Sequence, residues 1–312
     1  MGPVLITGAS GFIGAHLVRT LVRHGFDVVS VFHKAGLQED KRHFRLDLRD
    51  HHGLEMLFRQ FRFSSVAHLA AAGVSAEAQN FEELVSVNTV AAAALGRMAL
   101  GQGVERFLYV GSGFEYRPQA HAIDESAPLG ASNLYGASKA GGWLLLDAMH
   151  RLEGLPLTTF RPFSVYGPGE NPAKLVPYVI LQGLRREPIR LSLGSQVRDY
   201  VFIDDVVEAL RLGLTTPEAV GKIYNIGTGP QEARSIRQLA ESIVTLTGSP
   251  TRLCWFDRGD AGRRNPPYLV SDPTRAQIEL GWRAQVRLEE GLARTCAWYK
   301  AKTVSETTAC TG

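Results

Sequence analysis

Residues 4–14 read VLITGASGFIG, and this stretch decides the fold. A short apolar run, typical of a buried strand, leads into three glycines, and an apolar helical pattern follows through His24. Gly8 suits the tight turn, Gly11 lets a pyrophosphate approach the backbone, and Gly14 lets the helix pack closely on the strand. Because a helix start presents free N–H groups to anions, this segment predicts a dinucleotide-binding turn.

Apolar runs and helical patterns alternate outward from that turn through the first half of the chain. Continuous apolar strands separated by helices are typical of a parallel sheet that is buried on both faces. The sequence therefore predicts an α/β fold of the Rossmann type, a doubly wound parallel sheet. The predicted strands are 4–7, 28–32, 65–69, 106–111 and 157–161, and the predicted helices are 12–24, 54–61, 81–100 and 136–151.

The pattern changes after about Gly167, where prolines become frequent and the predicted elements become shorter. We expect residues 1–166 and about 201–226 to form the NAD(P)-binding domain. We expect about 167–200 and 227–300 to form a smaller C-terminal lobe. The tail, 302–312, has no periodic pattern and is predicted to be disordered.

Composition limits the classes of partner. The 312 residues carry a net charge of only +3, from 34 basic and 31 acidic residues, so we expect no nucleic-acid partner. The three cysteines are far apart and have no metal-ligand spacing, so we expect neither a disulfide framework nor a metal site. The first residues show neither a signal peptide nor a membrane span, and we expect a cytoplasmic protein with no membrane partner.

The end of the predicted second strand bears on the cofactor. An acidic residue about 20 positions beyond the glycines would bind the ribose 2′-hydroxyl of NAD. Here the strand ends at His33 and Lys34, which suit the 2′-phosphate of NADP, although Lys34 also fits a solvated loop charge. We therefore prefer NADP and keep NAD as an alternative. Asp47 fits either an adenine contact or a cap for the helix that starts near Asp50.

A serine and a Tyr-x-x-x-Lys pattern predict the chemistry. Tyr135 and Lys139 lie one turn apart on a helix, and the ammonium group is expected to lower the phenol pKa from about 10. The phenol could then exchange a proton with a carbonyl or alcohol oxygen, while nicotinamide exchanges hydride with the carbon. Ser112 follows the fourth strand at its carboxyl end, where open α/β sheets bind ligands. These three residues are the predicted catalytic set.

Further motifs extend this pattern over residues 3–300. With them the chain resembles the extended short-chain dehydrogenase/reductase family, in its nucleotide-sugar epimerase, dehydratase and reductase branch. The motifs are Thr7–Gly14, Asp47–Arg49, His68–Ala71, Asn88, Ser112, Tyr135, Lys139, Arg161–Gly169, Arg198–Tyr200 and Tyr224–Gly227.

The resemblance implies a role for residues along the whole chain. It implies a nucleotide-diphosphate sugar substrate and a homodimer through helices 81–100 and 136–151. Arg264, with Arg263, fits the diphosphate or a solvated loop equally well. The implied cofactor-binding residues are Gly8, Ser10, Gly11, Phe12, Ile13, Gly14, His33, Lys34, Asp47, Leu48, Leu69, Ala70, Ala71, Asn88, Tyr135, Lys139, Pro162 and Val165. The implied substrate-binding residues are Ser112, Ser164, Leu175, Val176, Arg198 and Arg264.

Departures from the family pattern separate the activities. Ser164 stands where such proteins often carry Asn, which affects one expected substrate hydrogen bond. Gly113 and Phe114 occupy the positions of the acid–base carboxylates of 4,6-dehydratases, and Glu115 is shifted along the chain, so the resemblance disfavours a dehydratase.

These departures leave four functions open, one of which is another dehydrogenase of the same family. We predict an NADPH-dependent 4-ketoreductase acting on a nucleotide-linked 6-deoxy-4-keto sugar, because residues 111–116 resemble such enzymes. An NAD-dependent nucleotide-sugar 4-epimerase, which keeps its cofactor, is the alternative. A non-catalytic NADP-binding regulator is disfavoured because Ser112, Tyr135 and Lys139 are all present.

Overall fold

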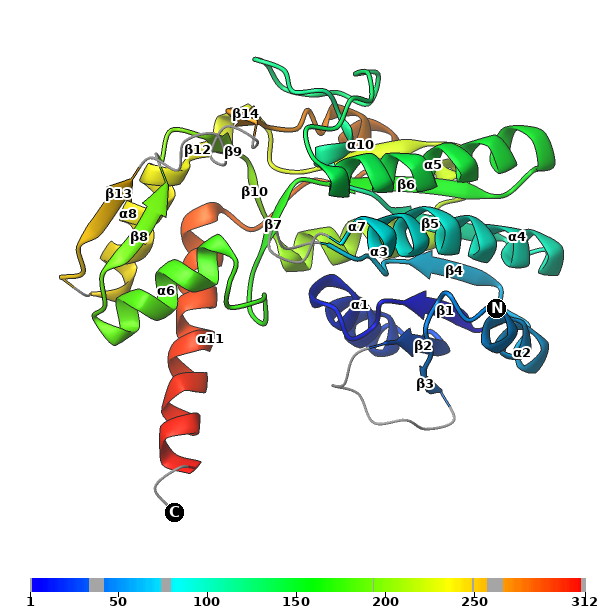
Figure 1. The fold of residues 1–312 in the computed structure, drawn as a ribbon, viewed down its shortest axis with the longest axis horizontal. Helices are drawn as coiled ribbons and strands as arrows, with labels where there is room; N and C mark the ends of the chain where they lie inside the picture. The colour runs from blue at the N-terminus through cyan, green and yellow to red at the C-terminus, as the bar shows by residue number, and fades with distance from the viewer. Residues whose placement is uncertain are drawn as a thin grey trace.

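The computed structural model describes residues 2–33, 42–73, 80–192, 194–248, 250–256 and 266–309. A large sheet lies between two layers of helices, and a smaller lobe lies beside it, on the left in Figure 1. The predicted residues Lys34 and Arg264 lie outside the described part of the chain.

The large sheet has seven strands, and every neighbouring pair is parallel. From one edge to the other the order is β11, β6, β5, β4, β1, β2 and β3. The order reverses at β1, and ligands of open α/β sheets bind outside the carboxyl ends of the strands at such a reversal. The predicted Rossmann-type fold is confirmed. The strands are β1 (Val4–Thr7), β2 (Val28–Phe32), β3 (His43–Arg45), β4 (Ser65–His68), β5 (Arg106–Val110), β6 (Leu157–Pro162) and β11 (Ile223–Ile226).

Helices cover both faces of this sheet. On one face, α1 (Phe12–Arg23) and α7 (Ile203–Thr215) bury their apolar sides against the strands. On the other face, α2 (His51–Gln60) and the long α5 (Leu134–Glu153) do the same. The inner strands such as β1, β2 and β4 are therefore buried on both sides, which explains their short apolar runs.

The predicted helix 81–100 is built in three pieces. These are α3 (Phe81–Glu83), the π-helix η2 (Leu84–Ala91) and α4 (Ala92–Gln102), which form one continuous rod beside α5. By length and composition alone the stretch Phe81–Gln102 is apolar enough to cross a membrane. Its buried side, which includes Ala91 and Leu95, packs in the apolar core on one face of the sheet.

The smaller lobe is built from separate segments of the C-terminal half of the chain. Three helices, α6 (Leu175–Arg185), α8 (Ile236–Thr247) and α11 (Leu288–Ala309), pack around a common apolar core. Its short strands are β7 (Ser164–Tyr166), β8 (Ile189–Ser192), β9 (Val197–Arg198), β10 (Tyr200–Phe202), β12 (Arg234–Ser235), β13 (Leu253–Phe256) and β14 (Tyr268–Leu269), and α10 (Thr274–Glu279) lies beside β11.

The tail differs from the prediction. Residues 302–312 are predicted to be disordered, but α11 continues to Ala309. The segment from Lys302 to Ala309 contains neither Gly nor Pro, so nothing in its local chemistry stops a helix that has already begun in the lobe.

Candidate active site

The glycine turn has the geometry expected of a phosphate cradle. Gly8 has φ of +71°, and a Cβ atom there would lie 2.7 Å from the Ala70 nitrogen. A Cβ atom on Gly14 would overlap the Gly8 carbonyl oxygen, so only glycine allows α1 to approach β1 this closely. Gly11 is the N-cap of α1, and the first turn carries no acidic side chain. The helix start therefore offers its N–H groups to an anion.

Basic side chains gather at the end of β2, where the adenosine ribose would lie. His33 is the first residue after β2, and its Nε2 atom is 3.6 Å from Asp47 Oδ2. Arg49 Nε lies 3.0 Å from Asp47 Oδ1, and these hydrogen bonds lower the pKa of Asp47 to about 2. Asp50, rather than Asp47, caps α2 by accepting the Gly53 N–H. Arg49 stands in the quoted Asp47–Arg49 motif but was not among the predicted site residues.

Asn88 supports the loop after β4. Its Nδ2 group donates to the Ala72 carbonyl and, at 2.9 Å, to Ser138 Oγ, and its Oδ1 atom accepts the Ala72 N–H. The side chain is fully buried, and both amide hydrogens are used. The side chain thus holds the loop after β4, next to Leu69, Ala70 and Ala71, against α5. Its predicted contact with the dinucleotide stays a prediction.

The start of α5 is packed against the turn that carries Ser112. Ser112 follows β5, and its Oγ atom accepts the Phe114 N–H of η3 (Gly113–Glu115) at 3.2 Å. Asn133 caps α5, so Tyr135 lies in its first turn and Lys139 one turn later. A Cβ atom on Gly136 would overlap the Phe114 carbonyl oxygen. This close approach brings the predicted catalytic residues to the same edge of the sheet.

The charges around this set differ from the sequence-based expectation. Lys139 is buried, with Nζ 4.3 Å from the centre of the Tyr109 ring, and burial lowers its pKa to about 8 against an opposing effect of Glu115. Burial raises the pKa of Tyr135, and the Glu115 carboxylate raises it further. The expected lowering of the Tyr135 pKa by Lys139 is therefore wrong for the protein alone, because Glu115 is the charge that acts on this phenol.

Glu115 is the residue near the site whose role the sequence did not reveal. Its Oε1 atom accepts the Ser112 N–H at 2.8 Å, and its Oε2 atom accepts from Arg161 Nε at 2.7 Å. The side chain is fully buried, so the carboxylate faces the protein core. Its pairing partner, Arg161, stands 46 positions away in the sequence, in β6.

The predicted substrate residues, together with the predicted cofactor residues Pro162 and Val165, lie on the elements that join the sheet to the lobe. Pro162 ends β6, and Ser164 and Val165 lie in β7. Leu175 and Val176 form the start of α6, and Arg198 ends β9. Arg198 is mostly buried, and its Nη1 group donates to the Val197 carbonyl at 2.7 Å. Among the described residues there is no group of three or more side chains able to hold a metal ion.

The glycine turn and Lys139 both fit a nicotinamide dinucleotide. The glycine turn leaves space that a Cβ atom would fill. Lys139 Nζ has no hydrogen-bond partner among the described residues, so a buried donor remains for a ribose hydroxyl.

Comparison with known proteins agrees with this geometry. The model of the "NAD dependent epimerase/dehydratase family" matches residues 4–227. A UDP-glucose 4-epimerase of Mycolicibacterium smegmatis is 31% identical over 96% of this chain and 98% of its own length. A dTDP-glucose 4,6-dehydratase of Haemophilus influenzae is 29% identical over 95% of this chain and 97% of its own length.

Solved structures resemble the whole chain. MoeE5 in complex with UDP-glucuronic acid and NAD has a TM-score of 0.88 at 31% identity, covering 96% of this chain and 100% of that one. UDP-glucose 4-epimerase of Thermotoga maritima, with UDP-glucose, has a TM-score of 0.87 at 26% identity, covering 96% and 99%. Sequence, fold and site therefore agree that this chain belongs to the NAD-dependent epimerase/dehydratase family.

Proposed function

We propose that this protein reduces the 4-keto group of a nucleotide-linked 6-deoxy sugar. The proposal rests on one observation, that the carboxylate next to Ser112 is already hydrogen-bonded within the protein. Gly113 and Phe114 follow this serine, and the nearest carboxylate, that of Glu115, is occupied by the Ser112 N–H and Arg161. Proton and hydride exchange need only a hydroxyl and a phenol at the sugar oxygen, whereas elimination of water needs a free acid–base group. The site supports the former.

Each member of the catalytic set has a distinct role. Tyr135 gives its proton to the sugar oxygen at C4, and Ser112 Oγ donates a hydrogen bond to the same oxygen. Lys139 holds the ribose hydroxyl groups with its ammonium group. Bound nicotinamide supplies the hydride that the C4 carbon accepts. Arg198, Leu175 and Val176 are proposed to hold the nucleotide part of the substrate.

We propose NADPH as the reductant. His33 stands at the end of β2 in the position where a carboxylate would bind the ribose 2′-hydroxyl of NAD. The nearby Asp47 is held by Arg49, and Arg45 Nε lies 3.4 Å from the His33 carbonyl. Basic groups at this end of the strand favour an added phosphate.

An NAD-dependent 4-epimerase is the second candidate. The observation in its favour is that several similar proteins are named 4-epimerases, and that similar solved structures contain NAD. Tyr135 would then take the proton of the C4 hydroxyl group, with Ser112 and Lys139 in the same roles as above. Bound NAD would accept the C4 hydride and give it back to the opposite face of the 4-keto sugar. The two candidates differ in whether the cofactor stays bound and whether a net redox change occurs.

One assay distinguishes the candidates. Purified protein is first analysed for bound cofactor. It is then given a nucleotide-linked 4-keto-6-deoxy sugar with NADPH or NADH, and separately UDP-glucose without added cofactor. A ketoreductase consumes NADPH only with the keto sugar, whereas an epimerase retains NAD and converts UDP-glucose to its C4 epimer. Loss of either activity in Tyr135→Phe assigns it to this site; absence of both activities would overturn both candidates for these substrates.

A further inference from the structure

We propose that Glu115, held by Arg161, is a positioning residue of the catalytic set: it fixes the Ser112 turn and keeps a buried negative charge beside Tyr135 and Lys139. This inference rests on the proposed function only in that Tyr135 exchanges the proton. It applies equally to reduction and to epimerisation.

The Ser112 turn is built around the Glu115 carboxylate. Glu115 and Ser112 form a reciprocal cap: Ser112 Oγ accepts a backbone N–H of the turn, and Glu115 Oε1 accepts the Ser112 N–H. A Cβ atom on Gly111 would overlap Glu115 Oε1 and lie 3.1 Å from its Cδ atom. Glycine at 111 is therefore needed for the carboxylate to reach the backbone of Ser112.

The buried ion pair is not explained by stability alone. The side chains of Arg161 and Glu115 are 2% and 0% exposed, and the guanidinium carbon lies 4.6 Å from the centre of the Tyr116 ring. Burial of two charges costs so much solvation that an apolar pair of similar volume often stabilises a protein equally well. Arg161 Nη2 also has no hydrogen-bond partner within the described ranges. Such a pair is poorly suited to a purely structural role.

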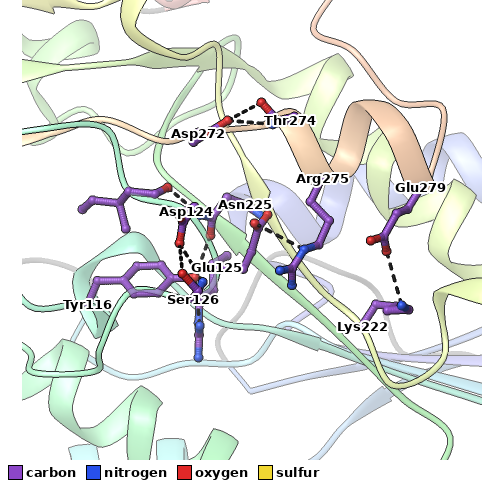
Figure 2. Close-up of polar contacts among 12 residues, drawn as sticks. Tyr116, Asp124, Glu125, Ser126, Lys222, Asn225, Asp272, Thr274, Arg275 and Glu279 are labelled. Atoms are coloured by element: carbon purple, nitrogen blue, oxygen red, sulfur yellow. Dashed lines mark hydrogen bonds and ion pairs between the residues drawn. The ribbon is translucent and has the colours of Figure 1, made fainter.

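A chain of hydrogen bonds anchors the pair to the rest of the sheet. Arg161 Nη1 donates to Tyr116 Oη at 2.9 Å, and Tyr116 Oη donates to Asn225 Oδ1 at 2.8 Å. Glu125 Oε1 accepts the Asn225 N–H at 2.8 Å, and Figure 2 shows this carboxylate facing Arg275. The turn that carries Ser112 is thereby fixed to β6, β11 and α10.

The carboxylate lies where its charge acts on the catalytic groups. The first turn of α5 packs on η3, and Glu115 raises the pKa of both Tyr135 and Lys139. The other polar groups around these two are Tyr109 of β5, next to both, and His68 of β4, on which Lys139 acts to lower the pKa. Arg161 of β6 acts on Tyr109 and Tyr116. Glu115 is thus the anion that retains protons on the catalytic pair.

The test is neutralisation of this charge. In Glu115→Gln the amide oxygen can still accept the Ser112 N–H, but the negative charge is gone. In the pH profile of kcat/KM, the inflection that reports protonation of Tyr135 is expected to move to lower pH by on the order of one unit. The double variant Glu115→Gln/Arg161→Gln removes the unpaired guanidinium as well, and its inflection is expected to lie equally low. Glu125→Gln, a neighbouring buried carboxylate in the same hydrogen-bond chain, is expected to leave the inflection unchanged.

A second readout separates this inference from the proposed function. Ultraviolet titration of each variant, taken as a difference from the same variant with Tyr135→Phe, reports the Tyr135 pKa without turnover. For reduction the rate falls as pH rises through the inflection, and for oxidation at C4 it rises, but both inflections move the same way. Failure of the ketoreductase assay therefore leaves this test intact. The inference is overturned if Tyr135 titrates identically in the wild type and in a folded Glu115→Gln or double variant.

Discussion

Lys139 combines an ammonium group with almost complete burial, and this has a consequence for stability. Burial lowers its pKa from 10.5 to about 8, so the unfolded chain binds the proton more tightly than the folded chain. The unfolded state then holds more protons between pH of about 8 and 10.5, and the free energy of unfolding rises with pH across that window. Below pH 8 the burial penalty is present in full.

Lys139→Met is therefore expected to abolish activity while stabilising the fold. At pH 7 its free energy of unfolding should exceed that of the wild type by on the order of 2–3 kcal/mol, and the difference should shrink above pH 8. Urea unfolding at both pH values measures it. Lys222→Met, which removes a half-exposed lysine, serves as the control and should show no such pH-dependent gain. Equal stability of Lys139→Met and wild type at pH 7 would contradict the argument.

Gly111→Ala tests the close approach next to Ser112. The added methyl group displaces the Glu115 carboxylate and leaves the buried Ser112 N–H without its acceptor, which costs about 1–3 kcal/mol. We expect a lower denaturation midpoint and a kcat reduced about tenfold, with KM for the dinucleotide little changed. Gly101→Ala, where a Cβ atom meets nothing within 4 Å, is the matched control. An unchanged kcat in Gly111→Ala would show that the carboxylate does not position Ser112.

Ser112, Tyr135, Lys139 and the glycine turn could be predicted from the sequence. Each belongs to a short motif whose place at the end of a strand or the start of a helix can be recognised locally. Glu115 has no local signal of this kind. Its position depends on a single turn of 3₁₀-helix and on Arg161, a partner distant in the sequence. Asn88 was found by resemblance, but its hydrogen bonds to Ala72 and Ser138 could not be predicted, since only three-dimensional packing brings these residues together.

At the level of elements, the π-helix η2 places Asn88 against α5. Asn88→Ala would leave the Ala72 backbone groups and Ser138 Oγ without this partner. We expect a loss of about 1–3 kcal/mol in stability and about tenfold weaker dinucleotide binding, because the loop of Ala70 is no longer fixed. Fluorescence titration with NADPH and NADH measures the binding. Ser86→Ala, in the same π-helix, should bind as the wild type does; equal binding by Asn88→Ala would refute the supporting role.

Long strongly periodic elements were predicted well, whereas irregular ones were not. Apolar periodicity locates a helix at 81–100 but does not distinguish hydrogen bonding to the fifth residue from that to the fourth, so η2 was missed. The short strand β3 has only partly buried and exposed residues and gives no apolar run. The helical tail was missed because 302–309 has no apolar period, although it continues an established helix.

At the scale of the whole molecule, α5 and the rod formed by α3, η2 and α4 expose apolar side chains. Val90 and Leu144 are about half exposed, at 50% and 52%, and Leu145 is 44% exposed. We predict a homodimer through these helices. Leu144→Asp combined with Val90→Asp should convert it to a monomer in sedimentation experiments, because charges in an apolar interface are costly. Ile278→Asp, on an exposed residue of α10, should leave the dimer intact; a wild-type monomer would refute the prediction.

The overlap between a methyl group at 111 and the carboxylate at 115 also restricts the order in which substitutions can accumulate. A chain with alanine at 111 has no place for the carboxylate, and a chain that loses Arg161 leaves the carboxylate buried without its counter-ion. Gly111 and Arg161 must therefore be present before glutamate at 115 becomes favourable. Glu115 must be replaced before either of the other two can be substituted. The three positions form one epistatic unit, so any transplant of this turn into a relative should move them together.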